Sequence, residues 1–280
     1  MNKIIRKERL NESVSKIIVS APHIARAAKP GQFVVVIPTS TAERIPLTIA
    51  DADKTAGTIT IIFQIVGATT KLLDTLEVGS EIPHLLGPLG QPTHIEKFGT
   101  VVVIGGGVGI AEIYPMVKAL KKAGNEVITI IGARNKDLLI YENELRTHSF
   151  ELRTTTDDGS SGRKGFVSDE LKDLIAAGKK ISLVFAVGPV PMMRVCAEVT
   201  RAHNIKTMVS LNPIMLDATG MCGVCRVTVG GETKFACVDG PEFDAHEVDF
   251  AELVNRLKTF KTQERQALDH VCKLVEGIKK

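Results

Sequence analysis

The chain has 280 residues, and its 35 Lys and Arg against 32 Asp and Glu give a formal net charge of +3 without any long like-charge run, so nothing predicts nucleic-acid binding. Apolar residues make up 44% and charged residues 24%, which excludes disordered, collagen-like and low-complexity classes. No apolar stretch reaches the ~18 residues of a membrane-spanning helix, and no signal segment is recognisable. We therefore expect a cytoplasmic protein without membrane contact.

The first segment, residues 1–98, is predicted to form a β-barrel. Short runs rich in β-branched residues alternate with turns that contain Pro or Gly, which is typical of a barrel or a sandwich. Only one helix is expected here, over residues 69–76. The expected strands cover residues 13–20, 32–37, 58–66 and 80–86.

The second segment, residues 99–210, is predicted to form a doubly wound α/β domain. Strands and helices alternate, and the strands are continuous apolar runs, as in a parallel sheet covered on both faces. The expected strands cover residues 101–104, 126–131, 151–155, 182–187 and 206–210. The expected helices cover residues 110–123, 141–147, 167–177 and 191–203.

The third segment, residues 211–280, is predicted to bind a metal cluster and to end in two helices. The chain has five cysteines, an odd number that is too sparse for a disulfide scaffold. Three of them fall within 16 residues, which favours metal ligation. A strand pair is expected at residues 226–229 and 233–237, followed by amphipathic helices over residues 250–260 and 263–278.

The cysteine spacing is the most specific signal in the sequence. Asp217 precedes Cys222, Cys225 and Cys237 in the pattern D-x4-C-x2-C…C. This is the plant-type 2Fe–2S spacing with Asp in place of the first Cys, and three thiolates with one carboxylate supply four anionic ligands. A zinc site, three unligated thiols, and Asp217 as an ordinary loop residue are the alternatives. The remaining cysteines, Cys196 and Cys272, are expected to be buried and without a role.

A glycine-rich turn follows the first strand of the predicted α/β domain. The run from Gly105 to Gly109 lies between a strand and a helix, where backbone N–H groups and a positive helix end meet a phosphate. The strict G-x-G-x-x-G fingerprint is absent, because Ile110 occupies its sixth position. The turn therefore predicts a nucleotide site of another family, with a tight turn without ligand as the alternative.

Three further strand ends are expected at the same edge of the sheet. Arg134 follows the second strand, where an Arg can receive the 2′-phosphate of NADP, although a solvated loop Arg is equally compatible. Asp157 follows the third strand, with turn formation or capping as its alternative. Gly188, Pro189 and Met192 follow the fourth. Since open α/β sheets bind ligands at this edge, the loops together predict a nucleotide cleft.

The barrel offers two weaker candidates for phosphate binding. The segment from Arg44 to Thr48 combines a cation, a Pro and a hydroxyl, which could hold a phosphate and the edge of a ring, with an exposed strand pair as the alternative. Thr69 and Thr70 open the only helix expected in the barrel. Its free N–H groups would suit a second phosphate, and an ordinary helix cap is the alternative.

Together these motifs resemble the ferredoxin–NADP reductase superfamily over essentially the whole chain. The resemblance depends on R-x-P-[LS]-[ST]-I, GGGVGIAE, TDDGS, GPVPMM and the cysteine-bearing C-terminus. Within the superfamily the chain resembles the electron-transfer subunit of dihydroorotate dehydrogenase B. It also resembles the small (alpha) subunit of NADH-dependent reduced ferredoxin:NADP oxidoreductase, also described as sulfide dehydrogenase. Asp217 stands where the dihydroorotate subunits have Cys, which favours the second group.

The resemblance implies three cofactors. For FAD it implies Arg44, Pro46, Leu47, Thr48, Phe63, Gln64, Ile65, Thr69 and Thr70. For the nicotinamide nucleotide it implies Gly106, Gly107, Val108, Gly109, Arg134, Asp157, Gly188, Pro189 and Met192. For the 2Fe–2S cluster it implies Asp217, Cys222, Cys225 and Cys237.

The resemblance also implies a reaction and a partner. A nicotinamide nucleotide would exchange hydride with FAD, and the cluster would pass single electrons to a larger iron–sulfur flavoprotein (beta) subunit. The complex would reach ferredoxin and couple NADH, ferredoxin and NADP by electron bifurcation. NAD(H) is the nucleotide implied here, against the weak indication of NADP from Arg134. The alternatives are the dihydroorotate dehydrogenase B electron-transfer subunit and, more remotely, a zinc-stapled nucleotide-binding regulator without redox activity.

Overall fold

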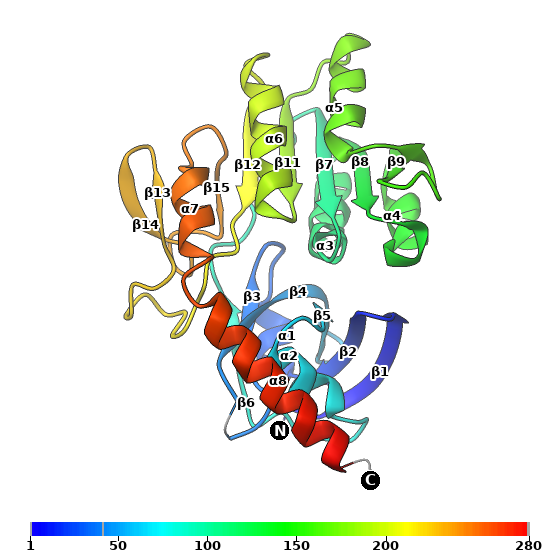
Figure 1. Ribbon diagram of the computed structural model, residues 1–280. Coiled ribbons are helices and arrows are strands. Elements are labelled where there is room, and N and C mark those ends of the chain that lie inside the picture. The colour runs from blue at the N-terminus through cyan, green and yellow to red at the C-terminus, as the bar shows by residue number, and fades with distance from the viewer. Residues whose placement is uncertain (1, 41, 279–280) are drawn as a thin grey trace.

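The computed structural model describes residues 2–40 and 42–278, with side chains as far as residue 274, and contains two sheet-bearing bodies (Figure 1). The N-terminal body is an antiparallel sheet in the order β1-β2-β5-β4-β3-β6. A bridge between Lys3 and Glu81 joins the start of β1 to the chain just before β6, and so closes the sheet into a barrel. The strands are β1 (Ile4–Asn11), β2 (Val14–Ser20), β3 (Phe33–Ile37), β4 (Ile45–Asp53), β5 (Thr58–Gln64) and β6 (His84–Leu89).

The barrel encloses a core of aliphatic side chains that its strand register aligns. Ile17 of β2 pairs with Ile61 of β5, and Val19 pairs with Ile59, and all four are fully buried. Such cross-strand pairs of β-branched residues stabilise an antiparallel sheet. The alternating pattern of β2 and β5 thus dictates which face turns inward.

The barrel contains two helices, α1 (Pro22–Ala27) and α2 (Ala68–Thr75), so the prediction of a single helix was wrong. Helix α1 gives no helical signal in the sequence, because the segment is short and begins with a Pro, a residue that also marks turns. Pro is tolerated at the first helical position, where its missing N–H costs nothing. Burial of Ile24 and Ala25 against the barrel then stabilises this short helix.

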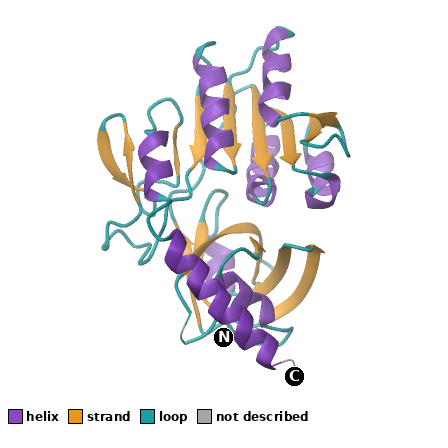
Figure 2. Cartoon of the chain, viewed as in Figure 1, coloured by secondary structure: helices purple, strands orange, loops and turns teal. Residues whose placement is uncertain are grey.

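The second body is a parallel sheet with one antiparallel edge strand, in the order β10-β9-β8-β7-β11-β12-β15. Helices cover both faces, with α3 and α4 on one and α5 and α6 on the other (Figures 1 and 2). The strands are β7 (Thr100–Gly106), β8 (Glu126–Ala133), β9 (Glu151–Thr156), β10 (Arg163–Lys164), β11 (Leu183–Val187), β12 (Thr207–Ser210) and β15 (Glu242–Asp244). The helices are α3 (Gly109–Lys122), α4 (Glu142–His148), α5 (Val167–Ala176) and α6 (Val190–Arg201), with a short 3-10 turn at Lys136–Leu138.

The central strand β7 shows why its sequence is apolar without alternation. Val101 and Val103 pack into the core on the α3 side, whereas Val102 and Ile104 pack into the core beneath α5 and α6. Both faces of the strand are therefore buried, as a doubly wound sheet requires. The predicted fold class, a β-barrel joined to a doubly wound α/β domain, is confirmed.

The C-terminal segment spans both bodies. Its strand β15, which the sequence analysis missed because it has only three residues, pairs antiparallel with β12 and extends the α/β sheet. The predicted hairpin is present as β13 (Arg226–Val229) and β14 (Glu232–Phe235). Helix α7 (Phe250–Arg256) follows, and α8 (Lys261–Ile278) crosses the barrel and packs on α2 (Figure 1).

A half-buried carboxyl lies where the barrel, the connecting segment and β15 meet. The hydroxyl of Thr93 donates a 2.5 Å hydrogen bond to Glu242 Oε1, and Gly31 lies against both. Burial raises the pKa of Glu242 from its ordinary value of 4.5 to about 7, although the hydrogen bond from Thr93 opposes the shift. The folded protein therefore binds this proton more tightly than the unfolded chain does.

The Glu242 carboxyl predicts a pH-dependent stability. The stabilisation from its proton is complete below the ordinary pKa and is lost as pH rises through about 7. Glu242→Gln, which stays neutral, should exceed the wild type in free energy of unfolding by about 3 kcal/mol near pH ~8, and by almost nothing near pH ~4. Urea denaturation at the two pH values measures the difference, with Glu264→Gln on α8 as the control. An equal difference at both values would contradict the prediction.

Candidate nucleotide, flavin and cluster sites

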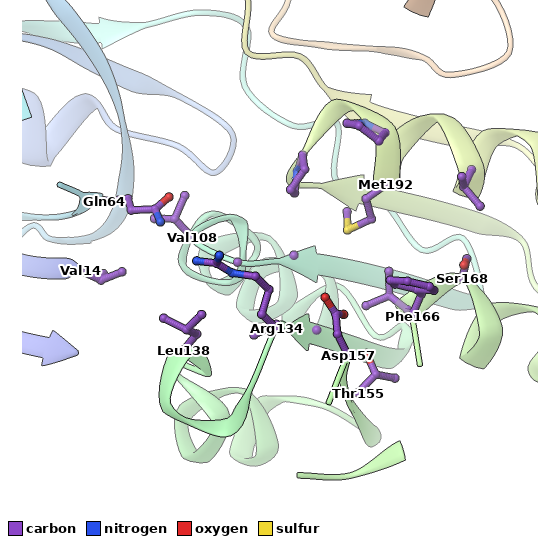
Figure 3. A pocket seen from close by; sticks show the side chains of 18 of the residues that line it. Val14, Gln64, Val108, Arg134, Leu138, Thr155, Asp157, Phe166, Ser168 and Met192 are labelled. Atoms are coloured by element: carbon purple, nitrogen blue, oxygen red, sulfur yellow. The ribbon is translucent and has the colours of Figure 1, made fainter. Parts of the chain in front are cut away.

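A cavity of about 520 Å³ opens at the carboxyl ends of the parallel strands β7, β8 and β9 (Figure 3). The barrel supplies part of its wall through Ser13, Val14 and Gln64. The cavity therefore lies between the two bodies, where a ligand can contact both. The predicted nicotinamide residues that line it are Gly106, Gly107, Val108, Arg134, Asp157, Pro189 and Met192.

The other two predicted nicotinamide residues, Gly109 and Gly188, do not line the cavity. A Cβ on Gly109 would lie 2.5 Å from the carbonyl oxygen of Val187, and one on Gly188 would lie 2.9 Å from the carbonyl oxygen of Gly106. Both glycines let α3, β11 and β7 approach closely, which is a packing role. The N-terminus of α3 is thereby held next to the cavity.

The glycine turn itself is tied to the neighbouring strand. Gly107 has a φ of +57°, a left-handed conformation that favours glycine, and its N–H donates to the carbonyl oxygen of Gly132 at 2.9 Å. This hydrogen bond connects the end of β7 to the end of β8. The turn can expose backbone N–H groups at the cavity without the six-residue spacing of the strict fingerprint.

Two oppositely charged side chains point into the cavity. Arg134 follows β8 and Asp157 follows β9, as Figure 3 shows. Within residues 2–40 and 42–278, neither side chain has a hydrogen-bond or ion-pair partner. The turn-forming role lies with the next residue, since Asp158 Oδ1 accepts the backbone N–H of Ser160 at 2.9 Å. A guanidinium and a carboxylate are thus both available to the ribose and phosphate groups of a nucleotide.

One wall of the cavity, at the start of α5, was not predicted from the sequence. Phe166 is 62% exposed although it is large and apolar, and it precedes Val167 and Ser168 at the helix N-terminus. Phe166 and Ser168 both line the cavity. Phe166 follows Gly165 in a loop that has no periodic pattern, so only its exposure in the fold identifies it.

The predicted FAD residues fall into three groups. Arg44 directly precedes β4, and Pro46, Leu47 and Thr48 lie among its first residues, 45–48; all four are partly exposed, as a ligand-binding strand requires. The side chain of Phe63 is 1% exposed inside the barrel core, so a ligand could reach only its backbone. Gln64 lines the cavity instead, and Ile65 packs against the barrel core.

The helix that was predicted to bind a second phosphate carries its own cap. Thr70 Oγ1 accepts the backbone N–H groups of Val66 at 3.1 Å and Gly67 at 3.0 Å. Thr69 is buried. The capping alternative therefore applies to Thr70, while phosphate binding at this helix stays a prediction.

Arg44 connects the barrel to the cluster loop. Its Nη2 donates to the backbone carbonyl oxygen of Asp217 at 3.0 Å. Its Nε is buried and has no hydrogen-bond partner. A buried donor without a partner costs about 1–3 kcal/mol. The orphaned N–H fits an acceptor that a bound cofactor would supply, which agrees with a flavin at this strand.

The predicted cluster ligands lie in two adjacent pairs. Cys225 and Cys237 are buried, and their Sγ atoms are 3.2 Å apart. Cys222 is exposed, and backbone N–H groups of Val224 and Asp217 lower its pKa. The electrostatic effect of Asp217 on Cys222, and of Cys222 on Cys237, shows that the pairs are neighbours.

The Asp217 carboxylate combines a loop role with a free oxygen. Its Oδ2 accepts hydrogen bonds from the backbone N–H and the hydroxyl of Thr219, which lower its pKa, and from the N–H of Met221 at 3.4 Å. Oδ1 has no hydrogen-bond partner within the part of the chain that the structure describes. In the same part, no three His, Cys, Asp or Glu side chains form a ready-made metal site. Three thiols and one carboxylate are the donors that a 2Fe–2S cluster needs, and binding of a cluster would bring the two pairs closer to each other.

The remaining cysteines lie apart from these pairs. Cys196 is fully buried on α6, and burial raises its pKa to about 12, which makes it an unreactive thiol. Cys272 on α8 is half-buried. The expectation of burial is thus confirmed for Cys196 and met only in part by Cys272.

Comparison with known proteins identifies the family. Residues 103–198 match the oxidoreductase NAD-binding domain, and residues 212–249 match the iron-sulfur cluster binding domain of dihydroorotate dehydrogenase B. The electron transfer subunit homolog of dihydroorotate dehydrogenase B from Thermotoga maritima is 45% identical over 98% of this chain and 96% of its own. The corresponding electron transfer subunit of Bacillus caldolyticus is 34% identical over 85% of this chain and 93% of its own. The chain belongs to the family of dihydroorotate dehydrogenase B electron-transfer subunits and their homologues.

A solved structure from work on flavin-based electron bifurcation by the NADH-dependent reduced ferredoxin-NADP oxidoreductase is also similar. Its TM-score is 0.92 with 44% identity, over 96% of this chain and 97% of that chain. The predicted resemblance and the prediction of an oxidoreductase subunit are confirmed. The predicted FAD, 2Fe–2S cluster and nicotinamide nucleotide are the cofactors of this family. Among the described helices, none has the length and hydropathy to span a membrane.

Proposed function

We propose that this electron-transfer subunit is the small subunit of an NADH-dependent ferredoxin:NADP oxidoreductase that bifurcates electrons. The main support is the likeness to the solved oxidoreductase, with a TM-score of 0.92 over almost the full length of both chains. A second support is Asp217, which occupies the first ligand position in the cluster spacing. The proposal includes a cytoplasmic location and the division of the chain at residues 98 and 210.

The chain's own residues bind and orient the cofactors. FAD supplies the exchange between hydride and single electrons, and the cluster supplies the one-electron outlet. Arg44 and Thr48 would hold FAD on β4, with the orphaned Nε of Arg44 donating to it. The loops at the cavity would hold NAD(H), with Arg134 and Asp157 at its ribose and phosphates. Gln64 of the barrel lines the same cavity, so a nucleotide bound there would lie next to the barrel.

The two ligand pairs would each take one iron of the cluster. Two thiolates bound tetrahedrally to one metal at ~2.3 Å are about 3.8 Å apart, and the Sγ atoms of Cys225 and Cys237 are already 3.2 Å apart. Asp217 and Cys222 would take the other iron. Arg44 would then contact both the flavin site and the cluster site. It lies at the strand proposed to hold FAD, and it donates a hydrogen bond to the backbone carbonyl oxygen of Asp217.

The cluster end of the chain would dock on a larger iron–sulfur flavoprotein (beta) subunit. A one-electron outlet requires an acceptor close by, and the relatives are named as electron transfer subunits. Next to the cluster ligands, Met221 is 87% exposed and Leu216 is 49% exposed. Exposed apolar side chains of this size are typical of a protein–protein contact. Ferredoxin would be reached through the complex.

Purification of the native complex tests the proposal. It should contain a larger subunit, FAD and iron, and it should reduce NADP with NADH and reduced ferredoxin together. The dihydroorotate dehydrogenase B role is the second candidate, favoured by the family match over residues 212–249, and dihydroorotate oxidation by the complex would establish it instead. An absorption spectrum without flavin or iron–sulfur bands would contradict both roles and favour the zinc-stapled regulator.

Asp217 provides a specific test of the cluster assignment. Asp217→Ala should lower iron content to less than about half, because the fourth ligand is lost and the Thr219 turn is loosened. Asp217→Cys should retain the cluster and change its reduction potential, since thiolate is a softer donor than carboxylate. Iron analysis and redox titration measure the two effects, with Glu247→Ala, an exposed residue of the same segment, as the control. Unchanged iron content and spectrum in Asp217→Ala would exclude the carboxylate as a ligand.

A further inference from the structure

A second cavity, of about 310 Å³, lies beside the loop that carries Asp217, Cys222 and Cys225. It forms where α7 packs against β13 and the chain turns into α8 (Figure 1). Val224 and Arg226, which flank Cys225 in the chain, belong to its wall. Among the described residues, none belongs to both this cavity and the nucleotide cavity, and none that lines it is a predicted FAD residue. The cavity therefore has no role in the cofactor sites described above.

Apolar side chains and two arginines line this cavity. The apolar residues come from α7, from the turn before α8 and from the segment around the cluster ligands, and they are Pro213, Ile214, Val224, Leu253, Leu257 and Phe260. Arg226 and Arg256 stay positively charged at any physiological pH. No described residue of the lining is acidic. The cavity therefore fits an occupant that combines an apolar group with an anion.

Both guanidinium groups keep free N–H donors. Nη2 of Arg256 donates to the carbonyl oxygen of Val224 at 2.9 Å, and Nη1 of Arg226 donates to that of Gly223 at 3.3 Å. A guanidinium has five N–H groups, and in the part of the chain that the structure describes neither arginine forms an ion pair. Arg153 of the α/β body, by contrast, pairs with Glu170 at 3.0 Å. An external carboxylate can thus bind to the arginines of the cavity without breaking an internal ion pair.

The surroundings of the cavity favour a protein segment over a small molecule. Phe260 in its wall is 45% exposed, and Leu216 and Met221 beside the cluster ligands are exposed as well. A small molecule inside the cavity would leave Leu216 and Met221 in water, whereas a protein surface can cover them together with Phe260. Arginine and aromatic residues are also the types that contribute most to such contacts.

We propose that a segment of the larger subunit docks here, with one large apolar side chain in the cavity and an adjacent Asp or Glu carboxylate on the two arginines. The apolar side chain packs against Leu257 and Phe260. Arg226 and Arg256 donate charge-assisted hydrogen bonds to the carboxylate. The segment thereby holds the partner next to Cys225. This docking rests on the proposed function, because it requires the larger subunit as the electron-transfer partner.

The affinity of holoprotein variants for the larger subunit, separated from the native complex, tests the docking. Arg226→Glu should weaken the complex at least about 30-fold, because it places two carboxylates against each other. Phe260→Ala should weaken it about 10-fold through lost apolar contact. Arg265→Glu on α8 is the matched control, since Arg265 is exposed and does not line the cavity, and it should stay within about 2-fold. Analytical ultracentrifugation measures the affinities, and added salt should weaken the wild-type complex more steeply than that of Arg226→Glu.

A cross-link identifies the group that binds to Arg226. Arg226→Lys keeps the positive charge and supplies a primary amine, which a carbodiimide joins to a carboxylate in direct contact. Mass spectrometry of the cross-linked complex should find an Asp or Glu of the larger subunit beside a large apolar residue. Arg265→Lys should give no such product.

The outcomes separate this docking from the proposed function. Iron content, FAD content and reduction of FAD by NADH should stay within about 2-fold of the wild type in every variant. If Arg226→Glu loses iron, Phe260→Ala, which lies outside the cluster ligand spacing, gives the comparison. Wild-type affinity in both Arg226→Glu and Phe260→Ala would overturn the docking and leave the proposed function standing. Self-association of the wild type that Arg226→Glu abolishes would also overturn it, because the occupant would be a second copy of this chain. If the wild type binds no larger subunit, the proposed function fails and the docking with it.

Discussion

Replacing Cys225 with Ser is expected to remove the 2Fe–2S cluster and to leave FAD in place. Cys225 is buried, and its Sγ lies 3.2 Å from that of Cys237. A serine hydroxyl is a much harder and less acidic donor than a thiol, so it cannot replace the thiolate in this pair. The flavin strand lies on the barrel and should keep its ligand. Electron transfer to the partner subunit should therefore stop, although NADH still reduces the flavin.

The iron–sulfur absorption and the iron content measure the loss, and the ratio of FAD to protein shows that the barrel is intact. We expect less than about a tenth of the wild-type iron, since losing a thiolate bound directly to iron is more severe than losing a group that supports a ligand. Cys272→Ser on α8 is the matched control, because this thiol is half-buried and outside the cluster. Full iron content in Cys225→Ser would refute the ligand assignment.

Replacing Gly109 with Ala is expected to disturb both the fold and the nucleotide cavity. The new Cβ would lie 2.5 Å from the carbonyl oxygen of Val187 and 2.9 Å from its carbonyl carbon, and backbone atoms cannot rotate away as a side chain can. Helix α3 would have to move off β11, which opens a packed core. We expect a loss of at least about 2 kcal/mol in free energy of unfolding. The N-terminus of α3 would shift as well, so affinity for the nicotinamide nucleotide should fall more than about 10-fold.

Gly178→Ala separates this effect from the general cost of a side chain on glycine. Gly178 has a φ of +73°, and a Cβ there would meet no atom within 4 Å. Its replacement should cost only the backbone strain of about 1–2 kcal/mol and leave nucleotide affinity unchanged. Urea denaturation and nucleotide titration compare the two variants. Equal effects of both substitutions on nucleotide affinity would contradict the close approach of α3 to β11 as the cause.

The α/β domain was predictable because its signals are local. The central strands β7, β8 and β11 bury both faces, so their apolar runs mark them without knowledge of their neighbours. The barrel was less so: β1 was missed because it carries four charged residues in eight, and α1 because it is short and begins with Pro. Both elements are stabilised by burial against the rest of the barrel. No periodic pattern in the sequence indicates that burial.

The sequence by itself determined the order of the cofactor segments and the spacing of the cluster ligands, because both depend on residues close together in the chain. Only the tertiary structure decided which distant segments meet. It joins Arg44 to Asp217 across 173 residues, and it adds Gln64 of the barrel to the nucleotide cavity. Contacts of this kind follow from how the barrel packs on the α/β domain. The physical reason is that a local pattern shows which face of a strand or helix is buried, but not which other element covers that face.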